Sequence, residues 1–219
     1  MAVPVVTIDG PGGAGKGTVA SAIAKALGWH LLDSGALYRI IAVAGVADGI
    51  ALDDAQALVE MSEGLDIVFD DGQVHVNGAN LTDAIRTEEA GNNASQVAAL
   101  SPVRDAIFAL QQGFRRAPGL VADGRDMGTV VFTDAPVKIF LDASAEARAE
   151  RRYNQLKNNG LGVNFRALLE QIQERDARDR ERVVAPLKPA DDALVIDSTE
   201  MTIDEVVATV MTQISSKVE

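Results

Sequence analysis

The residues of this chain best placed for chemistry form a run of nine, Gly10 to Thr18, which reads GPGGAGKGT. An apolar run before it, Val3 to Ile8, predicts a buried strand, and the segment after it, Val19 to Leu27, has helical spacing of its apolar residues. Glycines allow backbone N–H groups to turn inward, and a helix start adds unpaired N–H donors that attract anions. With the positive charge of Lys16 beside them, these residues predict a phosphate-binding loop.

Two details leave a second interpretation of this loop open. The hydroxyl that normally follows the lysine and helps to hold Mg²⁺ comes one place late, because Gly17 precedes Thr18. The loop also contains the dinucleotide fingerprint Gly10-x-Gly12-x-x-Gly15, and Asp33 ends the next apolar run at a suitable distance. Lys16 favours the phosphate loop, since a transferable triphosphate end needs a lysine there and a dinucleotide pyrophosphate does not.

A second strand ends in charged residues. The apolar run Leu120 to Ala122 leads into Asp123, Gly124, Arg125 and Asp126. In phosphate-loop proteins an aspartate at such a strand end helps to hold the hydrated Mg²⁺, although Asp-Gly is also common in ordinary turns. We therefore expect Thr18 and Asp123 to hold Mg²⁺ through water.

Arginines occur at several separated strand ends and helices: Arg39, Arg104, Arg125 and the segment 175–182. The guanidinium fork matches phosphate oxygens two at a time, and phosphoryl transfer between two anions requires such neutralisation. The Asn-Lys-x-Asp sequence of regulatory GTPases and the Ser-Gly-Gly-Gln sequence of transport ATPases are both absent. The sequence thus favours a small-molecule kinase that holds a donor triphosphate and a phosphate-bearing acceptor.

Composition narrows the class further. The chain has 219 residues, enough for one sizeable core with a smaller lobe, and it has no cysteine. Its net charge of −12 argues against nucleic-acid binding, yet half of its twenty basic residues lie between Arg148 and Lys188. Some of these must be solvated partners of the acids interleaved with them on a helix, Glu170, Glu174, Asp176 and Glu181. No apolar run has membrane-spanning length, so we expect a cytoplasmic protein, and we expect it to be a monomer.

The order of predicted elements indicates an α/β fold. Apolar strands alternate with helices, which predicts a parallel sheet, and an insertion at Leu65 to Val76 has the period-two pattern of a hairpin. We expect further strands at 29–32, 120–122, 137–141 and 194–196, and helices at 34–47, 53–63, 81–86, 89–100, 102–116, 144–158, 163–182 and 203–214.

Several longer motifs resemble the bacterial cytidylate kinase family, a branch of the nucleoside monophosphate kinases. Gly17 followed by Thr18 is similar to the loop of that branch. The other motifs are Leu32-Asp-Ser-Gly-Ala-Leu-Tyr-Arg39, Asn93-Ala-Ser-Gln-Val97, Ala122-Asp-Gly-Arg-Asp-Met-Gly-Thr-Val-Val-Phe132, Lys138-Ile-Phe-Leu-Asp-Ala143, Glu174-Arg-Asp-x-Arg-Asp-Arg180 and Ala185-Pro-Leu187. The resemblance runs from Val5 to Ser198, with the motifs in the family's order.

The resemblance implies a phosphate-loop kinase fold. It has a five-stranded parallel sheet flanked by helices, a small monophosphate-binding lobe with a short antiparallel sheet, and a short lid. On this basis residues 1–219 form one cytidylate kinase domain. The core would comprise about 1–33, 117–147 and 183–219, the lobe about 34–116, and the lid with its following helix about 148–182. The break at Asn158 to Gly160 would mark the lid.

The resemblance also implies the reaction and its residues. ATP and CMP or dCMP would give ADP and CDP or dCDP, with Mg²⁺, as a step of pyrimidine nucleotide metabolism. ATP would lie on Gly10, Pro11, Gly12, Gly13, Ala14, Gly15, Lys16, Gly17 and Thr18, with the lid residues Arg148, Arg151 or Arg152 near the moving phosphoryl group. The acceptor phosphate would meet Ser34, Tyr38, Arg39, Arg125 and Arg182, the ribose Arg175 and Asp179, and the base Ser95, Arg104 and Asp126. Lys16, Arg39, Arg125 and Arg182 would be catalytic.

The assignment of the base has independent chemical support. Cytosine presents an amino donor beside the N3 acceptor, and an ionised Asp126 can only accept while Arg104 can only donate. Uracil would place a carbonyl against the carboxylate, at a cost of about 1–3 kcal/mol. Adenylate, shikimate and dephospho-coenzyme A kinases, or a regulatory nucleotide-binding module that transfers no phosphate, remain the alternatives.

Overall fold

The computed structural model describes residues 3–70, 73–158, 160 and 162–218. Its contacts divide the chain into two compact units. The first unit contains Met1–Asp33 and Gln112–Glu219, and the second contains Ser34–Gln111. Each unit has its own sheet.

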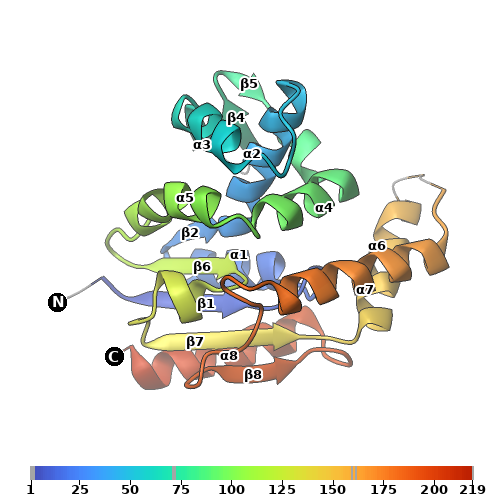
Figure 1. Cartoon of the computed structure of the whole chain (residues 1–219). Coiled ribbons are helices and arrows are strands. Elements are labelled where there is room, and N and C mark those ends of the chain that lie inside the picture. Colours follow the sequence, from blue (N-terminus) through green and yellow to red (C-terminus); the bar gives the residue numbers. More distant parts are fainter. Residues whose placement is uncertain (1–2, 71–72, 159, 161, 219) are drawn as a thin grey trace. The chain divides into compact units, whose positions relative to one another are not determined.

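The first unit is built on a five-stranded sheet whose neighbouring strands all run parallel (Figure 1). Every residue of the central strand and of one neighbour is buried, which explains their unbroken apolar runs. In spatial order the strands are β2 (His30–Asp33), β6 (Leu120–Gly124), β1 (Val5–Asp9), β7 (Val137–Asp142) and β8 (Leu194–Asp197).

Helices α1 (Lys16–Leu27) and α8 (Ile203–Lys217) cover one face of this sheet. Val6 and Ile8 of β1 belong to the same buried cluster as Ile23 of α1 and Val210 of α8. The closing helix starts at a capping box in which the side chains and backbones of Thr202 and Glu205 bond reciprocally. Helices α6 (Ala145–Asn158) and α7 (Phe165–Glu181) pack together at the end of the sheet to which β7 points (Figure 1).

The parallel register aligns the carboxyl ends of three strands. Asp9 of β1 lies opposite Gly124 of β6, and Asp33 of β2 lies opposite Asp123. The phosphate loop and the charged turn after β6 therefore leave the sheet at one edge, which is where open α/β sheets bind ligands.

The second unit combines a three-stranded antiparallel sheet with helices. Ile40 of α2 packs with Val74 and Val76 of β4 and with Ile85 in a small core. The elements are α2 (Ser34–Ala47), α3 (Ala55–Glu63), β3 (Ile67–Asp70), β4 (Gln73–Val76), β5 (Ala79–Asn80), η1 (Ala84–Arg86), α4 (Glu88–Val97) and α5 (Ser101–Gly113), which ends two residues beyond the unit. The predicted insertion with its own hairpin is confirmed.

The structure corrects some predicted elements. The helix expected over 81–86 is a single 3₁₀ turn, because the backbone N–H of Val74 bonds to Thr82 Oγ1 and that of Thr82 bonds to Asn80 Oδ1. The helix expected from Val163 begins at Phe165 because the Asn164 side chain caps it. After Asp126, where the sequence predicts no element, Met127–Val131 form one π-helical turn, η2.

No helix in the described ranges is both long and apolar enough to cross a membrane.

Gly119 provides a test of the packing beside the edge strand β2. A Cβ atom at Gly119 would lie 2.3 Å from Cδ2 of Trp29, the single tryptophan of the chain. Gly119→Ala is expected to lower the free energy of unfolding by about 1–3 kcal/mol, because the indole must move out of its packed position. Chemical denaturation followed by Trp29 fluorescence measures this change.

Gly113→Ala is the matched control, since a Cβ there meets nothing within 4 Å. Equal stability of the two variants would contradict the packing described for Trp29.

Candidate active site

The phosphate loop connects β1 to α1 at the carboxyl edge of the sheet. Gly10 has a φ of 150°, and a Cβ there would lie 2.0 Å from the Leu141 carbonyl oxygen, so only glycine fits. A Cβ built on Gly12 would lie 3.4 Å from Arg175 Nη1 and 3.5 Å from Arg125 Nη2. Two guanidinium groups from distant parts of the chain therefore stand over the loop, where they can reach an anion bound to it.

Lys16 lies at the first position of α1 and is only 5% exposed. Its Nζ donates a hydrogen bond to the Pro11 carbonyl at 2.9 Å and lies 3.8 Å from Asp123 Oδ1. Burial lowers the pKa of Lys16, the positive charges of Arg125 and Arg175 lower it further, and Asp123 opposes them. A phosphate anion would relieve this repulsion, so the lysine is placed to bind one.

Asp123 is the acid at the end of β6 that the sequence predicted to help hold Mg²⁺. Burial raises its pKa, whereas the charge of Lys16 acts in the opposite direction. A Cβ on Gly17 would lie 3.4 Å from Asp123 Oδ2, so the carboxylate stands over the start of α1, a helix on which Thr18 is exposed. The described residues contain no group of three acidic or histidine side chains that could enclose a metal. The predicted Mg²⁺ would have the Asp123 carboxylate and the Thr18 hydroxyl near it, and it keeps several waters and takes phosphate oxygens as ligands.

Asp179 of α7 brings two of the predicted arginines together. Its Oδ2 accepts a hydrogen bond from Arg125 Nε at 3.2 Å and lies 4.0 Å from Arg175 Nε. The Asp179 side chain is only 4% exposed, whereas those of Arg125 and Arg175 are 18% and 17% exposed. Arg182, at the end of the same helix, donates to the Ala185 carbonyl. The structure thus brings Arg125, Arg175 and Asp179 together beside the phosphate loop.

Arg148 has a structural place in this site. It is 2% exposed and donates to the carbonyls of Ala143 at 2.9 Å and Gly12 at 3.0 Å. It also forms two hydrogen bonds with the carboxylate of Asp176 on α7. A guanidinium that joins α6, α7 and the phosphate loop in this way fixes their mutual arrangement.

The other two lid arginines differ in how near the loop their partners lie, because Ser198, which Arg151 contacts, itself bonds to the Ala14 carbonyl of the loop. Arg151 donates to the carbonyls of Ser198 and Thr199, which follow β8. Arg152 donates to Gln155 Oε1 at 2.7 Å on its own helix. Their roles toward a transferred phosphoryl group stay predictions.

The predicted acceptor residues of the second unit lie on α2, α4 and α5. Ser34 Oγ accepts a hydrogen bond from Gln111, and Arg39 donates to the carbonyls of Ile85 and Thr87. The guanidinium of Arg104 lies 5.8 Å from the ring centre of Tyr38. Ser95 on α4 is buried. Asp126, the other predicted base-reading residue, is buried in the first unit.

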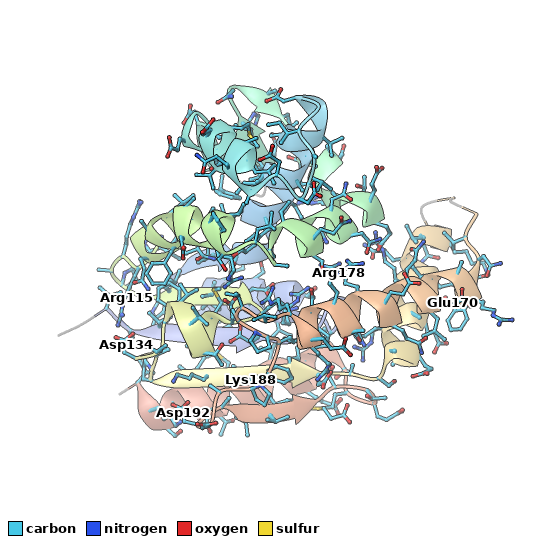
Figure 2. The ribbon with its side chains drawn as sticks, viewed as in Figure 1. Arg115, Asp134, Glu170, Arg178, Lys188 and Asp192 are labelled. Carbon is cyan, nitrogen blue, oxygen red and sulfur yellow. The ribbon has the colours of Figure 1, made fainter. Side chains whose placement is uncertain are left out.

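Some charges of the basic region, residues 148–188, are exposed to solvent, as the sequence predicted for part of its arginines. Arg166 and Glu170 on α7 form a pair at 3.2 Å with side chains 88% and 58% exposed, and Glu170 is labelled in Figure 2. Outside that region, Arg115 and Asp134, also labelled there, form an ion pair at 2.9 Å with side chains 20% and 62% exposed. An exposed pair such as Arg166 and Glu170 contributes little to stability.

Sequence reasoning missed Asp9 and Asp176. The predicted first strand stopped at Ile8, although an acid directly after an apolar run and before a glycine is a detectable signal. Asp176 was counted among the interleaved charges of a solvated helix. The carboxylate of Asp9 accepts hydrogen bonds from the N–H groups of Met127 and Gly128, both at 2.8 Å.

The sheet, the glycine loop and the lysine at the start of α1 define a phosphate-loop protein of the α/β class. The cytidylate kinase family model matches residues 6–216, and the chain belongs to this family.

The chain is 60% identical over 212 residues to the cytidylate kinase of Aeromonas salmonicida, which covers 95% of this chain and 92% of the relative. It is also 60% identical over 209 residues to that of Pectobacterium atrosepticum, with 94% and 93% covered. A solved structure of an uncharacterized protein from Eubacterium ventriosum is 11% identical, with 98% and 99% of the chains covered and a TM-score of 0.52. This last likeness concerns the fold alone.

The lowered pKa of Lys16 has a consequence for nucleotide binding. An ordinary lysine keeps its charge up to a pKa of about 10.4, whereas Lys16 loses its charge at lower pH. Because the neutral amine cannot attract phosphate, the affinity for a nonhydrolysable ATP analogue should fall as the pH rises through the pKa of Lys16. Calorimetric titrations between about pH 7 and pH 10 measure the affinity.

Lys16→Met is the control for this prediction, since it should bind weakly with a flatter pH dependence. Wild-type affinity that stays constant over the whole range would show that the charge of Lys16 does not bind the ligand.

Proposed function

We propose that this chain transfers the γ-phosphoryl group of ATP to CMP or dCMP, giving ADP and CDP or dCDP. The observation that carries the proposal is the cluster of Lys16, Arg125 and Arg175 around the phosphate loop, with two guanidinium groups within reach of Gly12. Membership of the cytidylate kinase family supports the same reaction class.

The chemistry follows from the charges in the cluster. Phosphoryl transfer between two nucleotides brings two polyanions together, and the transferring group spreads charge over its equatorial oxygens. Fixed cations lower this barrier because they are already oriented before the reaction begins. Lys16 would hold the outer phosphates of ATP, and the backbone of 10–15 would cradle them.

Arg125 would contact the acceptor phosphate from the same cluster. With Arg39 and Arg182 it would complete the catalytic cations, together with Ser34 and Tyr38 around that phosphate. Arg175 and Asp179 would meet the ribose. The ion pairs that now hold Arg125 and Arg175 at Asp179 keep both side chains near the loop before the nucleotides bind.

Mg²⁺ would bind between the nucleotide phosphates and this chain, through water molecules held by Thr18 and Asp123. Bound there, the ion neutralises phosphate charge. Asp123, which already lies 3.8 Å from Lys16, would then face two cations and stay ionised.

A panel of acceptors tests the proposed reaction. ADP release from ATP should be fast with CMP and dCMP, slower by about ten- to hundredfold with UMP because of the mismatch at Asp126, and slow with AMP. A coupled assay with the four acceptors at equal concentration measures these rates, and shikimate serves as an unrelated acceptor. Equal rates with UMP or AMP would contradict the proposed acceptor, and ADP release without any acceptor would favour a nucleotide-hydrolysing regulatory module.

Asp126→Asn tests the base-reading residue. The amide keeps the size of the side chain but adds a donor opposite the cytosine amino group. We expect the preference for CMP over UMP to fall by about tenfold while the KM for ATP stays unchanged. Steady-state kinetics with both acceptors measure the preference. An unchanged preference would remove Asp126 from the base site.

A further inference from the structure

The segment between β6 and η2 carries two residues of the proposed acceptor site, Arg125 and Asp126. At its first end, Gly124 pairs with Asp9 in the ladder between β6 and β1. At its second end, the N–H groups of Met127 and Gly128 bond to the two carboxylate oxygens of Asp9, each at 2.8 Å. Both ends of the arch Gly124–Gly128 are thus held by the same residue of the central strand.

The side chain of Asp9 has no other function in the site as described. It is 4% exposed and lies directly before the phosphate loop, which begins at Gly10. Burial raises its pKa to about 7, and the two N–H groups oppose this shift. A carboxylate is costly in such a place, and the first N–H groups of a helical turn need acceptors from outside the turn. The two hydrogen bonds meet both needs.

The backbone at Gly128, which donates one of these hydrogen bonds, has no space for a side chain. A Cβ on Gly128 would lie 2.8 Å from Thr7 Oγ1 and 3.2 Å from Lys138 Cδ. Glycine therefore lets the backbone of η2 approach β1 closely enough for Asp9 to reach it. A side chain at this position would push the two N–H groups away from the carboxylate.

We propose that Asp9 is a positioning residue for the acceptor, whose carboxylate holds the arch Gly124–Gly128 so that Arg125 and Asp126 meet the CMP phosphate and base. This inference rests on the proposed function. The strand that leads into the donor loop would thus also position the acceptor-binding side chains. Asp9 acts through the backbone and touches neither nucleotide.

Asp9→Asn tests the proposal with little change in volume. One amide oxygen can accept only one of the two hydrogen bonds while the amide NH₂ faces the other N–H, so the arch loses an anchor. The KM for CMP is expected to rise by about tenfold or more, while the KM for ATP changes by less than about threefold. The reason is that the lost hydrogen bond affects only the acceptor site. Steady-state kinetics with each substrate varied in turn measure both constants.

Val210→Ala is the matched control for stability. Val210 is fully buried on α8 and lies in the cluster on one face of the sheet, away from the arch. It should lower the melting temperature and leave both KM values as in the wild type. An Asp9→Asn enzyme whose two KM values both match the wild type, or rise equally, overturns the proposal.

Gly128→Ala tests the same contact from the other side, including the case in which Asp9→Asn does not fold. The clash with Thr7 should raise the KM for CMP selectively, and Thr7→Ala in the same chain should restore part of it because the clashing oxygen is removed. An unchanged KM for CMP in Gly128→Ala overturns the proposal. Failure of the proposed function would instead appear in the wild type, as absent turnover of CMP.

Discussion

The site depends on the burial of Lys16 beside one glycine loop, with two further positive charges close to it. Burial lowers the pKa of Lys16, and the charges of Arg125 and Arg175 lower it further, so bringing the three cations together costs free energy. Asp123 and Asp179 offset part of this cost, because each lies within ion-pair distance of at least one of the cations. Keeping these cations together therefore lowers the stability of the fold. The bound nucleotides would supply the remaining negative charge. Such preorganisation is what electrostatic catalysis requires.

The rest of the first unit fixes this arrangement in two ways. The parallel register places Asp9, Asp33 and Asp123 at one edge of the sheet. Arg148 joins α6 and α7 to the loop through Asp176 and the carbonyl of Gly12, so the helix that carries Arg175 and Asp179 cannot shift independently of the loop. These contacts are buried and charge-assisted, which makes them stronger than the exposed pairs on α7. Contacts with carboxylates and with backbone carbonyls therefore hold the cationic side chains of the site in place.

Much of this could be predicted from the sequence, because local patterns determine it. The unbroken apolar runs of β1 and β6 and the period-two hairpin identified the parallel sheet and the inserted antiparallel one, and Gly10 to Thr18 identified the loop. The sequence did not reveal which charged side chains pair in space. Asp9 and η2 are joined by a contact between segments that are distant in the sequence. No local pattern predicts a π-helical turn whose first N–H groups bond to an acceptor outside the turn. For the same reason the sequence did not show that Arg148, predicted near the moving phosphoryl group, pairs with Asp176 of α7.

The proposed transfer depends most directly on the buried charge of Lys16. Lys16→Ala removes that charge from a site whose other cations stay in place, and it also relieves their repulsion, so the variant should remain folded. Its kcat with ATP and CMP, measured beside circular dichroism and thermal unfolding, is predicted to fall by at least about 10²-fold, as when a preorganised group that stabilises developing charge is deleted. A folded Lys16→Ala protein that turns over at nearly the wild-type rate would contradict the account.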